Sequence, residues 1–290
     1  TGFYRCNINP TVGQEAYLLN TPKPESSRNV LIVGGGVGGM QAAITACDRG
    51  HKVTLIEKND KLGGTLLFAD YGHKDDLKNL KDYYVRQVEK RDIAVCCNTE
   101  ATLELLDEIN PSDLIVAAGA SPRVPNIRGI ENARYATAGY YEADSVGKKV
   151  VLIGGGLINC ELAVKFLEEG KEVTILELTD GILRDANMFI KPTIQQIFEK
   201  YADSVQVIKN ASTKSIEADG VIYTDTEGKE QKVSADTVLY AVGSIANAEV
   251  AEKLRAWPNW ESFRAIGDCT GASIVKKAIH QGYFAAMDIL

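Results

Sequence analysis

Two glycine-rich turns, each followed by a glutamate at the same distance, are the residues of this sequence whose types and spacing could do chemistry. In the first, Gly34, Gly36 and Gly39 follow a short apolar run, and Glu57 ends the next apolar run. A dinucleotide site needs a tight strand-to-helix turn, close approach of the backbone to a pyrophosphate, and free N–H groups where the helix begins. A carboxylate at the end of the second strand can accept hydrogen bonds from a ribose. The spacing therefore predicts a dinucleotide site at the first turn.

The second turn repeats the first. The segment RNVLIVGGGVGGMQAAITACDRGHKVTLIEK aligns without a gap with KKVVLIGGGLINCELAVKFLEEGKEVTILEL. Gly154 and Gly156 match the first two glycines, but Asn159 stands at the third position, where its side chain must either push the helix outward or find a polar partner. We still expect a dinucleotide here, because Glu177 matches the earlier glutamate. A carboxylate at this place repels a 2′-phosphate, so Glu177 favours NADH.

The elements that must position these residues follow from the apolar pattern. Each copy predicts a buried strand, a turn, a helix and a second strand, which is a βαβ unit with a parallel sheet. Between the copies we expect a helix over 75–91, strands at IAVCC and DLIVAAG, and a proline-punctuated connection over 120–129. After the second copy, SVQVIKN, GVIYTDTEGKEQKVSA and DTVLYAVG alternate like strands of a small meander with a turn at Glu227-Gly228. A last strand, a Gly267-Asp268 turn and a helix complete an α/β protein with two Rossmann-like domains.

Composition limits the kind of partner. The sequence has 290 residues and a formal net charge of −7, which argues against a nucleic-acid surface. No apolar run approaches the ~20 residues of a membrane span, and no signal-peptide pattern precedes the first strand. None of the six cysteines forms a C-x-x-C pair, so neither a redox dithiol nor a zinc site is predicted locally. We expect a cytoplasmic protein.

Taken together, these motifs resemble the flavoprotein superfamily in which an NAD(P)H domain is inserted into an FAD domain, each with three-layer packing. The resemblance implies a discontinuous FAD domain over 28–128 and 247–290, an NAD(H) domain over 129–246, and a linker over 1–27. AAGASP and AVGSIAN look like the two segments that cross between the domains, and KLGGT looks like the stretch beside the FAD pyrophosphate or ribityl chain. The cofactor-binding residues implied are Gly34, Gly36, Gly38, Gly39, Glu57, Lys58, Gly63, Gly64, Thr65, Ala118, Gly119, Gly154, Gly156, Leu157, Ile158, Glu177, Gly243, Gly267 and Asp268.

The opening stretch, CNINPTVGQE, indicates the branch. Disulfide reductases place a C-x4-C pair directly after the LGGT stretch, and this sequence has none there. The opening resembles the segment that joins barrel and nucleotide domains in the old-yellow-enzyme-like NADH:flavin oxidoreductases, which include 2,4-dienoyl-CoA reductase, 2-enoate reductases and trimethylamine dehydrogenase. In that family a TIM barrel with FMN comes first. Cys6, with Asn9 and Pro10, matches the last [4Fe–4S] ligand in a C-x-x-N-P pattern, so the barrel and three further ligands would precede Thr1.

The resemblance implies that NADH docks on the second unit and passes a hydride to FAD. Electrons would then cross the cluster to FMN in the barrel, where an activated alkene is reduced. Such a transfer needs orientation and electrostatics rather than a protein acid or base, so we name no catalytic residue, and Glu161 is a candidate only for shaping the site. His280, on the last helix, is a candidate for a place near the flavin.

Three alternatives stay open at this point. One is a glutamate-synthase-like electron-input subunit, a group that also depends on FAD but takes its electrons from NADPH. The second is a non-catalytic ADP- or FAD-binding domain, for which Asn159 would mark a second site that no longer binds NADH. The third is a stand-alone NADH-dependent reductase with bound FAD.

Overall fold

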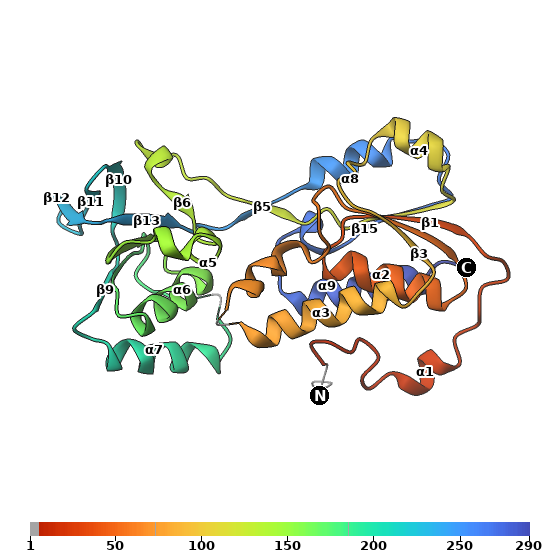
Figure 1. The fold of residues 1–290 in the computed structure, drawn as a ribbon, viewed down its shortest axis with the longest axis horizontal. Helices are drawn as coiled ribbons and strands as arrows, with labels where there is room; N and C mark the ends of the chain where they lie inside the picture. Colours follow the sequence, from red (N-terminus) through yellow and green to blue (C-terminus); the bar gives the residue numbers. More distant parts are fainter. Residues whose placement is uncertain (1–5, 73, 185) are drawn as a thin grey trace. The chain divides into compact units, whose positions relative to one another are not determined.

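A computed structural model describes residues 6–72, 74–184 and 186–290, and these divide into two compact units (Figure 1). Unit 1 comprises the described parts of Thr1–Asp70, Lys74–Ser121 and Ile245–Leu290. Unit 2 comprises those of Tyr71–His73 and Pro122–Ser244. The chain passes between the units through β5 (Ala120–Pro122) and β14 (Ser244–Ala246), which pair with each other.

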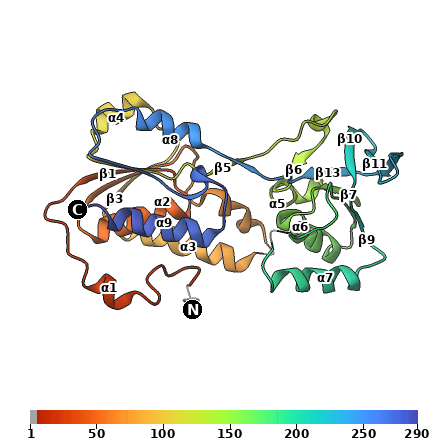
Figure 2. The same cartoon turned by 180° about the vertical axis from the view of Figure 1, so that it is seen from behind.

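Unit 1 is built on a sheet of five parallel strands in the order β15, β4, β1, β2, β3. The strands are β1 (Asn29–Val33), β2 (Lys52–Ile56), β3 (Ile93–Cys96), β4 (Asp113–Val116) and β15 (Ser262–Ala265). Helices α2 (Val37–Asp48), α3 (Asp75–Glu89) and α9 (Val275–Met287) cover one face, and α4 (Leu103–Ile109) and α8 (Ala248–Arg255) cover the other (Figures 1 and 2). Short elements are α1 (Glu15–Leu19), η1 (Gly64–Tyr71) and η4 (Gly267–Thr270).

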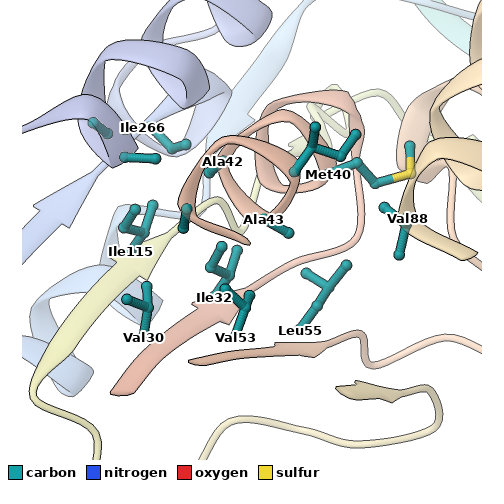
Figure 3. Close-up of a cluster of buried hydrophobic side chains, with 14 of the residues drawn as sticks. Val30, Ile32, Met40, Ala42, Ala43, Val53, Leu55, Val88, Ile115 and Ile266 are labelled. Atoms are coloured by element: carbon teal, nitrogen blue, oxygen red, sulfur yellow. The ribbon is translucent and has the colours of Figure 1, made fainter. Parts of the chain in front are cut away.

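Strand β1 shows why unit 1 has three layers. Its side chains point alternately to the two faces of the sheet, as in any strand, and all but the first are buried. Val30 and Ile32 join the core under α2, where Met40 and Val88 also pack (Figure 3). Leu31 belongs to the core under α4 and α8. A strand that is apolar on both faces is what a parallel sheet between two helical layers requires.

Unit 2 has a second parallel sheet, in the order β6, β13, β7, β8, β9. Its strands are β6 (Arg134–Tyr135), β7 (Lys149–Ile153), β8 (Glu172–Leu176), β9 (Val205–Ile208) and β13 (Thr237–Tyr240). An antiparallel sheet of β10 (Ser212–Glu217), β11 (Gly220–Thr224) and β12 (Glu230–Ser234) shares a buried core with it. The helical elements are α5 (Ala138–Tyr141), α6 (Leu157–Glu168), α7 (Ile190–Lys200), η2 (Ile130–Asn132) and η3 (Ala143–Ser145).

The structure confirms the α/β class and the parallel sheets, and corrects the predicted meander. SVQVIKN and DTVLYAVG supply β9 and β13 of the parallel sheet, and the meander consists of β10 to β12 with its turn at Glu227-Gly228. All four residues of β13 are buried, as expected for a strand covered on both faces. Among the described residues, no helix is long and apolar enough to cross a membrane.

Candidate dinucleotide sites

The first glycine turn lies between β1 and α2, at the carboxyl end of the sheet of unit 1. Gly34 has a φ of +108°, and a Cβ there would lie 2.3 Å from the carbonyl oxygen of Ala117. A Cβ on Gly39 would lie 1.9 Å from the carbonyl oxygen of Gly34, so the helix can begin this close to the strand only with glycine. Gly36, the N-cap of α2, has open space beside it and no side-chain cap. The start of α2 therefore lacks a capping side chain, as the N-terminus of a helix that binds an anion does.

The Glu57 carboxylate is fixed against this turn. Its Oε2 accepts the Gly35 N–H at 2.7 Å, and its Oε1 accepts the backbone and side-chain N–H groups of Asn59 at 2.8 and 2.7 Å. The side chain is 5% exposed, and its burial is matched by these three donors. Such a carboxylate has a defined direction, which is what recognition of a ribose at the strand end requires.

The KLGGT loop packs on the same turn. The Gly63 N–H donates to the Gly35 carbonyl at 2.9 Å, and a Cβ on Gly64 would lie 2.9 Å from the Gly36 Cα. Both glycines have positive φ, +129° and +55°. The loop therefore needs its glycines in order to approach the turn, and it borders the open space beside Gly36.

The late Gly-Asp turn lies at the end of β15, and α9 follows it. Gly267 has a φ of +69°, and its N–H donates to Gln281 Oε1 of α9 at 2.8 Å. Asp268 Oδ1 accepts the Ser273 N–H at 2.9 Å, so this carboxylate holds the loop before the helix. Gly119, within the first crossing segment, has a φ of +68°, and Asn247 Nδ2 donates to the Ala118 carbonyl at 2.8 Å.

In unit 2 the turn between β7 and α6 has the same form with a different third residue. Gly154 has a φ of +102°, and a Cβ there would lie 2.4 Å from the Ala241 carbonyl oxygen. Asn159 is fully buried, and its Nδ2 donates to the carbonyls of Ile153 and Gly154, at 2.8 Å each. Of the two outcomes expected for Asn159, the structure has the one in which the amide finds polar partners within the turn. Its Oδ1 is buried and has no hydrogen-bond partner.

Glu177 repeats the geometry of Glu57. Its Oε2 accepts the Gly155 N–H at 2.6 Å, and its Oε1 accepts the N–H and the hydroxyl of Thr179 at 2.7 Å each. A pocket of about 480 Å³ opens beside it, entirely within unit 2. Its lining includes residues 125–127, 153–156, 176–179, 211–213 and 241–243, so Gly154, Gly156, Glu177 and Gly243 all border one cavity.

The internal symmetry extends beyond the glutamates. Asn59 and Thr179, each two residues after its glutamate, bind Oε1 in the same way. Leu183, with a φ of +56°, occupies the place of Gly63, and its N–H donates to the Gly155 carbonyl at 2.8 Å. Continuing the sequence alignment past Glu177 would have found these residues, although a leucine gives no sign of a left-handed backbone.

Several predicted residues lie elsewhere. Lys58 is exposed next to Glu57, and Thr65 is exposed in η1. Among the described residues, those that line the pocket of unit 2 do not include Leu157, Ile158 or Glu161. Glu161 is half-buried in α6. The burial of Tyr140 in α5 raises the pKa of its hydroxyl, and the charge of Glu161 raises that pKa further. Gly38 lies in α2 and contacts α9. The two helices are so close there that a Cβ on Gly282 of α9 would lie 2.2 Å from the Gly38 carbonyl oxygen.

Cys6 is half-buried in unit 1, and the backbone around it turns toward its sulfur. The Ile8 N–H donates to Cys6 Sγ at 3.4 Å. The N–H groups of Asn9 and Ile8, opposed by some desolvation, lower the pKa of the thiol. Hydrogen bonds to sulfur also surround the cysteine ligands of iron–sulfur clusters, and this geometry is compatible with the ligand role that the resemblance implies for Cys6. Within the described residues, no group of three or more His, Cys, Asp or Glu side chains could hold a metal ion.

Known proteins share this architecture over nearly the whole chain. The model of the pyridine nucleotide-disulphide oxidoreductase family matches residues 28–257. Cinnamate reductase of Clostridium sporogenes is 34% identical over 98% of this chain and 42% of its own length. Bilirubin reductase of Mediterraneibacter gnavus is 32% identical over 98% of this chain and 44% of its own length. The structure of 2-naphthoyl-CoA reductase in complex with 2-naphthoyl-CoA superposes with a TM-score of 0.87 at 32% identity, covering 98% of this chain and 43% of that one. The chain thus spans less than half the length of these relatives.

Proposed function

The chain belongs to the pyridine nucleotide-disulphide oxidoreductase family, and we propose that it is the part of a reductase that takes electrons from NADH into FAD. The observation that carries the proposal is the repeated geometry of two carboxylates. Glu57 accepts the Gly35 N–H of the first turn, and Glu177 accepts the Gly155 N–H of the second. FAD would bind to unit 1 and NADH to unit 2. When bound, the two cofactors supply the hydride chemistry, and the protein holds and orients them.

In unit 1, we assign the FAD pyrophosphate to the open space beside Gly36 and the ribose to Glu57. Three features support this: the space itself, the uncapped start of α2, and the approach of Gly64 to within van der Waals distance of the turn. The flavin end would extend toward Gly267-Asp268. Because α9 begins shortly after this turn, its positive end would favour negative charge on the reduced ring.

In unit 2, we assign the adenosine half of NADH to the pocket beside Glu177. The carboxylate already accepts three hydrogen bonds from protein donors, so it stays an acceptor for the ribose hydroxyls and repels a 2′-phosphate. Asn159 keeps its turn close to the strand by donating to two carbonyls. This supports a working second site over one that Asn159 has disabled.

We further propose that the electrons leave FAD for a [4Fe–4S] cluster and an FMN barrel in a longer protein, with Cys6 as one cluster ligand. The N–H donors around the Cys6 sulfur support this, as does the length of the relatives. The relatives are named as reductases of cinnamate, bilirubin and 2-naphthoyl-CoA, all conjugated unsaturated compounds. We therefore propose an activated alkene as the final acceptor, and a cytoplasmic location, in keeping with six free cysteines.

The test is anaerobic reduction of the purified chain reconstituted with FAD. We expect NADH to bleach the visible flavin absorbance and NADPH to do so much more slowly. Glu57→Ala should lose FAD, whereas Glu177→Ala should keep FAD and lose reduction by NADH. A chain that binds ADP in both units but no FAD would refute the proposal in favour of a non-catalytic nucleotide-binding region, and rapid reduction by NADPH would favour the glutamate-synthase-like alternative.

A further inference from the structure

The Cys6 loop is anchored on the last helix of unit 1. The Cys6 carbonyl oxygen lies 2.9 Å from His280 Nε2 of α9. A carbonyl can only accept, so Nε2 carries the proton and donates it. The two residues are 274 positions apart in sequence, which makes this contact a tertiary one rather than a feature of the loop.

Helix α9 is in turn fixed to the dinucleotide turn. Gly282 packs on α2 at the Gly38 carbonyl, where a Cβ would lie 2.2 Å from the oxygen. Gln281, next to His280, accepts the Gly267 N–H at 2.8 Å. One helix thus contacts the helix that begins at the FAD turn, the Gly-Asp turn assigned to the flavin, and the Cys6 carbonyl.

We propose that His280 is a positioning residue for electron transfer: by donating to the Cys6 carbonyl, it fixes the cluster-ligating loop against the helix that also holds the flavin turn. This rests on the function proposed above. The transfer it serves moves one electron at a time from reduced FAD, which takes two from each NADH, to the cluster. No bond to His280 forms or breaks, and the residue acts by keeping one cluster ligand at a constant place relative to the FAD turn.

The first test needs neither cluster nor barrel. His280→Ala should speed hydrogen exchange of the backbone over residues 6–11, and alkylation of Cys6 by iodoacetamide, about fivefold, as expected when one hydrogen bond is lost. His280→Gln, which keeps an N–H donor at similar reach, should behave like the wild type. Lys277→Ala, an exposed neighbour in α9, is the matched control and should change neither rate. Equal rates in wild type and His280→Ala would overturn the anchoring.

The second test uses a longer protein that carries the cluster, with rapid-freeze electron paramagnetic resonance as the readout. We expect His280→Ala to leave bleaching of FAD by NADH unchanged, while the reduced-cluster signal forms several-fold more slowly and its midpoint potential shifts. His280→Gln should restore both. Unchanged cluster kinetics and potential in His280→Ala would overturn the positioning role. A wild-type protein without iron would instead refute the proposed electron route, and the exchange experiment would still report on the anchor separately.

Discussion

Replacing Asn159 with aspartate should destabilise unit 2 selectively, because it exchanges a donor for an acceptor where only a donor fits. Asn159 Nδ2 lies 2.8 Å from two carbonyl oxygens, and the side chain is fully buried. In the isosteric variant, a carboxylate oxygen would face those carbonyls, without a charged partner. An unpaired buried charge costs about 3–5 kcal/mol. Since a domain is stable by only ~5–15 kcal/mol, unit 2 would become marginal.

The stability of unit 2 in Asn159→Asp should fall as pH rises. Burial and the two carbonyls raise the pKa of the introduced carboxyl above its unfolded value of about 3.9. A protonated carboxyl can donate to one carbonyl, so the variant should be closest to wild type below that value and lose stability as pH rises. Asn159→Gly removes two hydrogen bonds of ~1 kcal/mol each and also the unpartnered Oδ1, so it should cost less than the aspartate variant at pH 8.

Hydrogen exchange of the amides in β7 and α6, followed at several pH values, measures these changes as opening free energies, and NADH titration reports the effect on binding. Asn187→Asp is the matched control in the same unit, because Asn187 Oδ1 accepts the N–H groups of Phe189 and Ile190 and a carboxylate can do the same. If Asn159→Asp at pH 8 were as stable as Asn187→Asp, the amide would not be holding the turn and the argument for Asn159 would fail.

Three further predictions concern single residues. Gly39→Ala should abolish FAD binding, seen as loss of flavin absorbance after purification, because its Cβ would lie 1.9 Å from the Gly34 carbonyl oxygen; a yellow variant would contradict this. Glu177→Arg should move the ratio of NADH to NADPH affinities at least about tenfold toward NADPH, roughly 1.4 kcal/mol, and an unchanged ratio would refute the role of Glu177. Burial, and next the charge of Arg49, lower the pKa of His51, so the wild type should lose stability as pH falls below about 6.5 and His51→Gln should lose less, as thermal unfolding between pH 5 and 8 would show.

The parts of the fold that the sequence predicts best are those with a local, repeated pattern. The two βαβ units could be found because apolar strand, glycine turn and acidic strand end recur in register. β9 and β13 were misplaced in the meander because alternation within a segment does not say which strand lies beside it. Their parallel pairing with β8 and β7 is set by contacts far apart in sequence.

The residues of the candidate sites also differ in how well the sequence predicts them. Steric limits require glycine at these turns wherever the motif occurs, so the sequence pattern predicts the positions of the glycines. Leu183 adopts a left-handed backbone that its residue type disfavours, and the surrounding turn enforces it. The contact between His280 and Cys6 joins opposite ends of the chain, and no periodicity or spacing could have indicated it.

The discontinuity of unit 1 has a consequence for how the protein is made. The part of unit 2 between Pro122 and Ser244 is continuous in sequence, so it can fold during synthesis as soon as that stretch is available. Unit 1 is completed later, because its edge strand β15 and its helix α9, which covers α2, follow unit 2 in the sequence. The first dinucleotide turn therefore stays without its covering helix until α9 has been translated. Of the two sites, the one that begins first along the chain is therefore completed last, and until then the surface of α2 that α9 covers is open to the solvent.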